Sequence, residues 1–437
     1  MHEQPPHGDA LKIGIAGLGN VGASAVRLLQ NNARHIAARA GRPVVVTAVS
    51  ARDATRQRGF SMDGIAFHAD ARDLVKDANV DVVVELIGGA QGIAWDVVSS
   101  ALALGKPVVT ANKAMLALRG KDVLGALASS AAPLAYEAAV AGGIPAIKTL
   151  REGLAANTIR AVYGILNGTC NYIMSEMTAT GRAFADVLVD AQVLGYAEAD
   201  PTFDVDGHDA SHKLAILASL AFGGVPNVDA IKVSGIRAVS ALDIGFAREL
   251  GYRIRLLGIA RQRDNGIEQS VEACLVPVDS PLASVEGPLN AVYVDGDFSG
   301  KILLTGAGAG GDATASAVVA DIIDIARGHR LPLLGRPVAA DETAGVAPIG
   351  KRTGHFYLRL QVIDQPGVIA DVSAILRDCA VSLETVLQRG RDPGQEVSVI
   401  LTTHETEQAR IDDAVARIAA LKAVKEPPHL MRIEVLS

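Results

Sequence analysis

The sequence predicts an α/β protein: a doubly wound parallel sheet comes first, then an α+β domain, then a compact βαββαβ unit at the C-terminus. Short apolar runs rich in β-branched residues alternate with helical stretches in the N-terminal third, and parallel strands buried on both faces give this pattern. The chain has 437 residues, of which 49% are hydrophobic, so it can bury two or three cores.

The first expected strand, Leu11–Ala16, runs directly into a glycine-rich turn. A helix follows, because apolar residues recur at helical spacing from Ala25 to Leu29. Three further apolar runs complete the predicted parallel sheet: Val44–Val49, Val80–Leu86 and Pro107–Thr110.

The pattern changes near Pro133. From there to about residue 305, helices such as 209–222 mix with alternating strands such as 271–276, which is typical of an α+β domain. A helix is expected over 314–328, after a glycine-rich turn. The segment 336–354 has no sustained periodicity and reads as a linker.

The last part of the chain alternates again between strand and helix patterns. Strands are expected at 356–362 and 397–403, and helices at 368–376 and 411–421. This spacing predicts the compact βαββαβ unit.

Composition excludes several classes of function. The net charge of -7, from 41 Lys and Arg against 48 Asp and Glu, gives no basic surface for nucleic acid. No apolar run reaches the ~18–20 residues of a bilayer span, and the first ten residues are polar, so we expect a cytoplasmic protein without a membrane partner. Three widely spaced cysteines, Cys170, Cys274 and Cys379, are interpreted as buried small side chains.

The glycine-rich turn is Gly17-x-Gly19-x-x-Gly22, between a predicted strand and a predicted helix. In a Rossmann-type fold this arrangement lets the main chain approach a pyrophosphate at the positive end of the helix. A purely structural turn is the alternative. The second strand ends at Val49-Ser50-Ala51-Arg52, with Asp53 only afterwards, which favours NADP over NAD unless Arg52 is a solvated surface residue.

The densest polar cluster runs from Glu198 to Lys213 and places five acids within twelve residues. A helix beginning near Gly207 puts Asp209 and Lys213 on one face, at i and i+4. A surface ion pair is the simpler interpretation, but the apolar run that follows indicates a buried helix whose polar end faces a cleft. His208 and His212 lack a third ligand at a spacing that suits zinc.

Lys113 follows the strand that ends at Thr110. Open α/β sheets bind ligands at the carboxyl ends of their strands, so Lys113 is a candidate site residue.

The chain resembles the homoserine dehydrogenases over its whole length, because a set of motifs occurs in the order found in that family. These motifs are the glycine turn, Glu85-Leu86-Ile87-Gly88-Gly89, Ala111-Asn112-Lys113, Tyr136-Glu137-Ala138, Asn167-Gly168-Thr169-x-Asn171-Tyr172, the Glu198–Lys213 stretch and Gly306-Ala307-Gly308-Ala309-Gly310. The C-terminal unit, with Asp364-Gln365-Pro366-Gly367-Val368 before its first helix, resembles an ACT domain. One departure is Asp312-Ala313-Thr314, where relatives often carry proline before Thr-Ala-Ser-Ala-Val.

The resemblance implies reversible NAD(P)-dependent reduction of L-aspartate 4-semialdehyde to L-homoserine, in threonine, methionine and isoleucine biosynthesis. It also implies the domain order: a Rossmann-like domain (1–136, completed by 306–335), an α+β domain for catalysis and dimerisation (137–305), a linker (336–353) and an ACT-like domain (354–437).

Site residues follow from the resemblance. Lys213 is the favoured proton donor, with Lys113 as the open alternative, and Asp209 orients the lysine or a water. The residues expected to bind substrate are Glu198, which takes the α-ammonium group, together with Asp204, Gly168, Thr169, Tyr196 and Lys113. The residues expected to bind cofactor are Gly17, Gly19, Asn20, Val21, Gly22, Arg52, Ile87, Gly88, Lys113, Gly195 and Gly308.

The resemblance further implies a monovalent cation, Na⁺, held by Glu137 and the carbonyl oxygens of Val140, Gly142 and Ile144. Hard oxygens suit such an ion, and a glycine turn without a cation is the alternative. L-Threonine is the expected effector of the ACT-like domain, and edge-to-edge pairing of such domains predicts a homodimer or homotetramer.

Two rival functions stay open at this point. One is another NAD(P)-linked dehydrogenase acting on an amino-acid semialdehyde, although an acylating type needs a cysteine with a base and Cys170 has no histidine close in sequence. The other is a non-catalytic sensor, which has no use for the set of Glu198, Asp209, Lys113 and Lys213.

Overall fold

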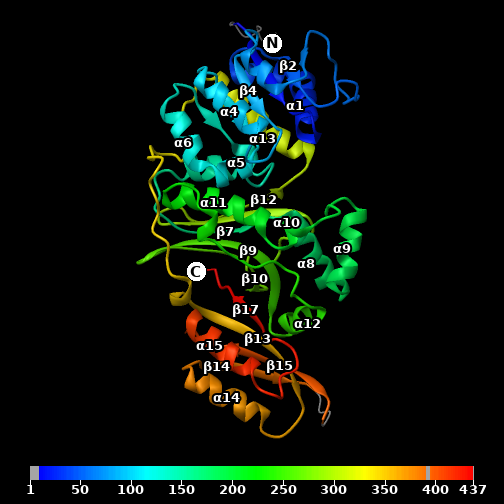
Figure 1. The fold of residues 1–437 in the computed structure, drawn as a ribbon, viewed down its shortest axis with the longest axis vertical. Helices are drawn as coiled ribbons and strands as arrows, with labels where there is room; N and C mark the ends of the chain where they lie inside the picture. Colours follow the sequence, from blue (N-terminus) through cyan, green and yellow to red (C-terminus); the bar gives the residue numbers. More distant parts are fainter. Residues whose placement is uncertain (1–8, 390–393, 437) are drawn as a thin grey trace. The chain divides into compact units, whose positions relative to one another are not determined.

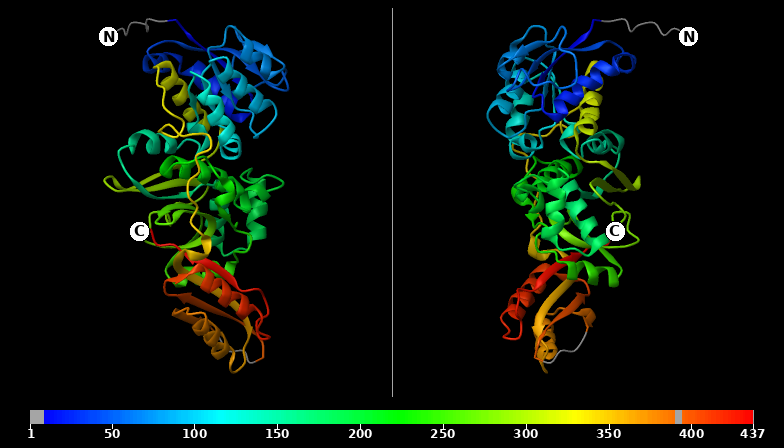
Figure 2. Two further views of the ribbon diagram at one scale, coloured as in Figure 1. Left: turned by 60° about the vertical axis from the view of Figure 1, so that its left-hand side comes forward. Right: turned by 90° about the vertical axis from the view of Figure 1, so that its right-hand side faces the viewer.

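The computed structural model describes residues 9–389 and 394–436, which divide into two compact units (Figures 1 and 2). Of the described residues, the first unit contains 9–166, 211–229 and 290–344, and the second contains 167–210, 230–289, 345–389 and 394–436. Residues 1–8, which are most of the polar N-terminal stretch used to predict a cytoplasmic protein, lie outside the described part of the chain. The three predicted domains and their linker are a different division and remain a prediction.

A six-stranded parallel sheet organises the first unit. Its strands are β1 (Leu11–Ala16), β2 (Val44–Ser50), β3 (Ala66–His68), β4 (Val82–Glu85), β5 (Val108–Thr110) and β6 (Leu134–Ala135). They lie in the order β3-β2-β1-β4-β5-β6, and all pairs are parallel. This is the doubly wound order, in which ligands bind where the strand order reverses, between β1 and β4.

The core of this sheet is built from strand residues that have no exposed surface, among them Ile13, Ile15 and Val84. The helices of this part are α1 (Asn20–Asn31), α2 (Ala33–Ala40), α3 (Ala71–Lys76), α4 (Ile93–Ala103), α5 (Lys113–Leu118), α6 (Gly120–Ala128) and α13 (Gly311–Ala326). Val318 and Ile322 of α13 share one apolar core with α1, so a segment from late in the chain completes this layer.

The remainder of the first unit supplies a short antiparallel set of strands. These are β7 (Ile159–Ile165), β11 (Leu289–Gly296) and β12 (Gly300–Ala307), and β11 pairs antiparallel with β7. A 3-10 turn (Glu137–Ala139), α7 (Ala146–Lys148) and a π-helical turn (Thr149–Gly153) precede them. Helix α11 (His208–Phe222) is buried along Leu214–Ala218, as its apolar sequence predicts.

The second unit contains a long hairpin formed by two twelve-residue strands, β9 (Tyr252–Arg263) and β10 (Gly266–Pro277). Its other strands are β8 (Lys232–Val233), β13 (Thr353–Ile363), β14 (Leu383–Gln388), β15 (Glu396–Thr403), β16 (Thr406–Glu407) and β17 (His429–Ile433). Its helices are α8 (Gly168–Thr180), α9 (Phe184–Val193), α10 (Thr202–Val205), α12 (Ala241–Glu249), α14 (Val368–Asp378) and α15 (Gln408–Ala419).

The C-terminal module has the predicted βαββαβ order, formed by β13, α14, β14, β15, α15 and β17. Its strands lie in the order β17-β13-β15-β14, with antiparallel pairs. Its core contains Phe356, Leu358, Val372 and Ile411. Strand β17 also pairs parallel with β10, so the sheet of the module continues into the hairpin.

The predicted fold class is confirmed: a doubly wound parallel sheet, an α+β part and a C-terminal βαββαβ module. All three cysteines are buried, as expected. Among the described residues, no helix combines the length and the apolar character that crossing a bilayer requires.

Candidate active site

In the glycine turn after β1, the first and third glycines pack against other main-chain atoms, whereas the second has free space beside it. A Cβ atom at Gly22 would lie 2.0 Å from Gly17 O, and one at Gly17 would lie 2.6 Å from Leu86 O. A Cβ at Gly19 would meet no atom within 4 Å. Gly19 is the N-cap of α1, so the first-turn amides of Asn20 and Val21 belong to a helix N-terminus with space in front of it. Such an end binds phosphate groups.

A cavity of about 640 Å³ adjoins this turn. Its lining combines Gly19, Asn20 and the segment 309–313 with three arginines, Arg27, Arg56 and Arg58. Arg58 Nε donates to Leu18 O at 3.1 Å and its Nη2 donates to Asp53 O at 2.6 Å, which ties the loop after β2 to the glycine turn. None of these three arginines was predicted from the sequence. Two of them could have been, because the run Arg52-Asp53-Ala54-Thr55-Arg56-Gln57-Arg58 places Arg56 and Arg58 close to the predicted phosphate contact Arg52.

Arg52, the predicted contact for a 2′-phosphate, is exposed just beyond β2 and does not line this cavity. Ile87 and Gly88, also predicted to bind cofactor, follow β4 and are exposed, and Gly88 has a φ of 84°. The turn thus lies at the carboxyl end of β1, and Ile87 and Gly88 lie at that of β4.

A buried carboxylate organises this edge of the sheet. Glu85, the last residue of β4, has no exposed surface, and its Oε1 accepts the N–H groups of Ile87 at 2.8 Å and Gly88 at 3.0 Å. Its Oε2 accepts the Thr110 hydroxyl at 2.7 Å. Glu85 therefore holds the loop after β4 against the end of β5. The sequence analysis gave Glu85 only as part of a motif.

Lys113 begins helix α5 directly after β5. Asn112 caps this helix, because its Oδ1 accepts the N–H of Met115 at 3.0 Å, while its Nδ2 donates to Gly89 O at 2.7 Å. Lys113 is half-buried. The cap and the link to Gly89 place Lys113 beside the loop that Glu85 holds.

The predicted cation segment contains two consecutive residues with left-handed backbone, Ala141 (φ 57°) and Gly142 (φ 54°). A Cβ at Gly142 would lie 2.6 Å from Gly308 O, so the segment touches the glycine-rich turn before α13. Gly308 itself has no room for a side chain, because a Cβ there would lie 1.9 Å from the Asn290 side chain. Val140 and Ile144 are buried on either side of this bend.

Glu137 is a buried carboxylate at the start of this segment. Its two oxygens accept the N–H groups of Ile147 at 2.9 Å and Lys148 at 2.8 Å, and its own N–H donates to Asp321. Burial, and then the neighbouring charge of Asp321, raises the pKa of Glu137 to about 7. Lys148 Nζ pairs with Asp321 at 3.3 Å and offsets part of this negative charge. Each Glu137 oxygen keeps a further lone pair, so its donor chemistry suits a hard monovalent cation.

Asn167 joins two of the predicted acids. It caps helix α8, because its Oδ1 accepts the N–H of Cys170 at 2.8 Å. Its amide nitrogen donates to Asp204 Oδ1 at 2.8 Å and to Asp209 Oδ2 at 2.9 Å. Both carboxylates therefore lie at the N-terminus of α8. The sequence analysis assigned no role to Asn167, which appeared only within a motif.

Gly168 and Thr169 form the first turn of α8, where main-chain N–H groups have no partner within the helix. The Thr169 hydroxyl donates to Tyr196 O at 2.6 Å, so the donor that Thr169 offers a ligand is its main-chain N–H. The rings of Tyr172 and Tyr196 lie 4.7 Å apart, which fixes Tyr196 over the start of this helix.

Gly195 precedes Tyr196 with a φ of 76°, a conformation that favours glycine. Glu198 follows in the same loop and is exposed. Gln192 Nε2 donates to Glu198 O at 3.1 Å, so the loop's main chain is tied to α9. The structure places Glu198 in the loop before α10, which carries Asp204.

Asp209 and Lys213 lie one turn apart on α11, as predicted, and both are buried, with exposed fractions of 4% and 7%. Lys213 Nζ donates to the main-chain oxygen of Leu166 at 2.7 Å. Leu166 directly precedes Asn167, the cap that holds Asp209. Lys213 Nζ is therefore a hydrogen-bond donor inside the protein rather than a surface group.

Comparisons with known proteins agree with these features. The family model described as homoserine dehydrogenase matches residues 145–323, that of the homoserine dehydrogenase NAD binding domain matches residues 17–137, and that of the ACT domain matches residues 356–423.

Relatives match along the whole chain. A homoserine dehydrogenase from Neisseria gonorrhoeae is 45% identical over 432 residues, which cover 98% of this chain and 99% of the relative. The crystal structure of a homoserine dehydrogenase from Thiobacillus denitrificans has a TM-score of 0.92 at 43% identity and covers 98% of this chain and 99% of its own. A hyperthermophilic archaeal homoserine dehydrogenase in complex with NADPH has a TM-score of 0.61 at 26% identity, over 72% of this chain and 97% of its own.

Proposed function

Because the chain belongs to the homoserine dehydrogenase family, an oxidoreductase family that acts on a CH–OH group, we propose that it interconverts L-homoserine and L-aspartate 4-semialdehyde. The observation that carries this proposal is the arrangement around the N-terminus of α8, where Asn167 holds Asp204 and Asp209. Lys213 donates to the carbonyl oxygen one residue before that cap. We place the reaction in threonine, methionine and isoleucine biosynthesis.

The cofactor site consists of the glycine turn, Ile87, Gly88, Gly195, Gly308 and Lys113. Support comes from the open space at Gly19 and the N-terminus of α1, which suit a pyrophosphate. When bound, the nicotinamide supplies or accepts the hydride. NADP is preferred over NAD, since Arg52 lies beyond β2 and three more arginines line the adjoining cavity. The NADPH complex of the archaeal relative agrees with this choice.

Lys213 serves as the proton donor when the aldehyde is reduced. Its Nζ protonates the oxygen that gains negative charge, and the same nitrogen takes the proton back when the alcohol is oxidised. The hydrogen bond to Leu166 O fixes the direction of the ammonium group. Asp209, one turn away, orients the lysine or a water. Lys113 assists from the end of β5 and is the alternative donor.

The substrate is a zwitterion, and the structure offers matched groups for each end. The amides of Gly168 and Thr169 at the start of α8 suit its carboxylate, because helix N-termini favour anions. Glu198 and Asp204 suit its ammonium group. Tyr196, held by Thr169 and Tyr172, forms a wall of the pocket.

A Na⁺ ion bound by Glu137 and the carbonyl oxygens of Val140, Gly142 and Ile144 would stabilise the bend against Gly308. Support comes from the left-handed backbone at Ala141 and Gly142 and from the crowded negative charge at Glu137. In this account the cation orders the segment that reaches the turn before α13.

The C-terminal module binds L-threonine as a feedback effector, and the enzyme is a cytoplasmic homodimer or homotetramer. Support comes from the ACT domain match and from β14, which ends the strand order of the module among the described residues. An edge strand of this kind can pair with a second copy.

The test is a spectrophotometric assay of L-homoserine oxidation with NADP and NAD in parallel, with and without L-threonine. We expect reduced nicotinamide to form with L-homoserine, faster with NADP, and threonine to slow the reaction. No reduction of either cofactor by L-homoserine would refute the proposed function, whereas insensitivity to threonine would refute only the proposed regulation.

A further inference from the structure

A cavity of about 470 Å³ lies within the second unit. One side is formed by the segment from Lys232 to Ala238 and by strand β10. The other side is formed by the C-terminal module, through the start of β13, the start of α15 and strand β17. Its volume falls within the range of small-molecule sites, roughly 300–1,000 Å³.

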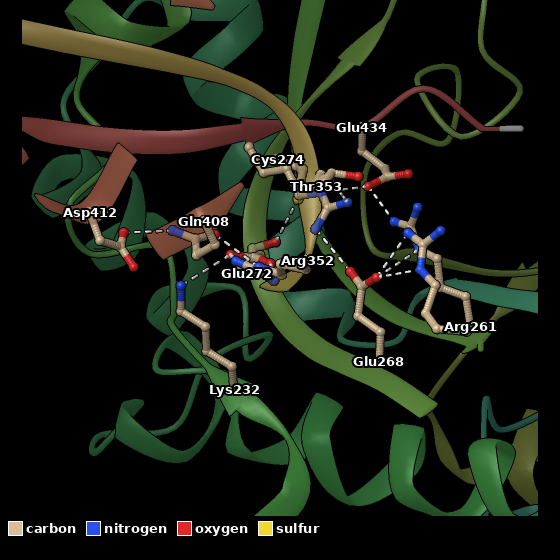
Figure 3. A network of polar contacts seen from close by, with 12 residues as sticks. Lys232, Arg261, Glu268, Glu272, Cys274, Arg352, Thr353, Gln408, Asp412 and Glu434 are labelled. Carbon is tan, nitrogen blue, oxygen red and sulfur yellow. Dashed lines mark hydrogen bonds and ion pairs between the residues drawn. The ribbon is translucent and has the colours of Figure 1, made fainter. Parts of the chain in front are cut away.

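One wall of this cavity is a network of buried charges (Figure 3). Arg352 donates to both oxygens of Glu272, at 2.6 and 3.1 Å, and its Nε donates to Gln408 Oε1 at 2.8 Å. Although burial opposes ionisation of Glu272, the Arg352 guanidinium holds its pKa down at about 2. These charges satisfy one another, so they shape the wall and leave no charge for a ligand.

The other buried arginine of the lining, Arg432, pairs with acids that do not line the cavity. Arg432 donates to Glu268 at 2.9 Å and pairs with Glu434 at 3.0 Å, and neither acid lines the cavity. Nearer the opening, Arg237 pairs with Asp206 and donates to Thr202 Oγ1 at 3.1 Å. Each arginine of the lining thus pairs with a carboxylate, and Arg432 shares its two acids with Arg261.

Lys232 is a further cation of the lining, and its only carboxylate contact among the described residues is a long one. Its Nζ lies 3.9 Å from Glu272 Oε2, which is beyond hydrogen-bond distance, and that carboxylate is already engaged by Arg352 (Figure 3). The Lys232 side chain is 35% exposed, so a ligand in the cavity can reach it. Arg237, 45% exposed on the same segment, offers further donors.

Apolar residues form another part of the lining, namely Phe356, Leu430 and Met431. A ligand that fits must therefore combine an anionic group with a short carbon chain. One extra ammonium group matches a single carboxylate better than a doubly charged phosphate.

We propose that this cavity binds a small carboxylate-bearing metabolite of amino-acid size, with Lys232 Nζ and Arg237 as the groups that receive its carboxylate. The site is distinct from the Asp364–Gly367 turn, which does not line the cavity. Because its two sides belong to different parts of the unit, an occupant stabilises the contact between the C-terminal module and the segment at Lys232.

The experiment is a calorimetric titration of the full chain with L-threonine, L-aspartate, succinate and inorganic phosphate, each up to tens of millimolar. We expect at least one carboxylate to bind, and both Lys232→Gln and Arg237→Gln to weaken it by at least about tenfold. Lys301→Gln, an exposed lysine on β12, is the matched control and should bind as the wild type does.

Four results would overturn the proposal. The first three are the absence of binding by every carboxylate, equal binding by Lys232→Gln and the Lys301→Gln control, and binding of phosphate alone. A probe whose binding is lost in Asp364→Asn but kept in Lys232→Gln occupies the turn instead and also contradicts it. The titration needs no turnover, so its failure is distinct from failure of the proposed function.

Discussion

The Asn167→Ser substitution tests whether the hydrogen bonds from the Asn167 side-chain amide to Asp204 and Asp209 matter for turnover. Serine is as good an N-cap as asparagine, so the bond to Cys170 N and the start of α8 are preserved. The substitution removes the amide donors to Asp204 Oδ1 and Asp209 Oδ2. We therefore expect the start of α8 to be kept, the free energy of unfolding to fall by about the value of the lost hydrogen bond, and Asp209 to be displaced.

The expected loss of kcat is estimated from how deeply Asp204 and Asp209 are buried. A hydrogen bond to a charged group contributes roughly 1.5–3 kcal/mol, and water can replace the one to half-buried Asp204. Asp209 is only 4% exposed, so its bond is lost in full. If that energy keeps Asp209 in its working position, kcat falls by about 10- to 100-fold.

The assay is steady-state L-homoserine oxidation beside a thermal unfolding curve. Asn167→Asp serves as the companion variant, because it keeps the cap and adds a third carboxylate facing Asp204 and Asp209. We expect kcat to fall in the order wild type, Asn167→Ser, Asn167→Asp. A kcat for Asn167→Asp within about threefold of the wild type would refute the reasoning.

Three further predictions concern other parts of the molecule. Asp209→Ala should lower kcat by at least about 100-fold while the Kd for NADP, measured calorimetrically, changes little; ordinary turnover would remove its role. Arg52→Ala should weaken the binding of NADP more than that of NAD in parallel titrations, and equal weakening of both would contradict the proposed 2′-phosphate contact. Glu272 has a pKa of about 2 in the folded chain, below its unfolded value, so its pairing with Arg352 stabilises the fold above about pH 4.5 and is lost as pH falls toward 2. Glu272→Gln should therefore destabilise the second unit by about 3 kcal/mol at neutral pH and flatten its acid unfolding between those limits, and unchanged acid unfolding would contradict this pairing.

Much of the fold was predictable because it is encoded locally. Leu11–Ala16, the glycine turn and α1 follow one another along the chain, and each has a strong pattern of its own. The two- and three-residue strands β3 and β6 have no such pattern, since their place depends on pairing with β2 and β5. The parallel pairing of β17 with β10 joins segments too far apart in sequence for any local signal.

The candidate site divides in the same way. Asp209 and Lys213 were predictable because both lie within one helix, at a spacing that geometry fixes. The roles of Glu85 and Asn167 depend on partners about 25 to 42 residues away, so only coordinates reveal them. The contacts of Arg58 were not predictable for a different reason. Its guanidinium donates to the main-chain oxygens of Leu18 and Asp53, which lie in loops without a periodic sequence pattern.

The most direct test of the account compares the turnover of Lys213→Ala and Lys113→Ala in reduction of the aldehyde, with calorimetric binding of NADP as the check on folding. The account predicts that Lys213→Ala loses at least about 100-fold in kcat and binds NADP normally, and that Lys113→Ala loses less. Turnover of Lys213→Ala close to that of the wild type would contradict the claim that this ammonium group, held by Leu166 O, delivers the proton.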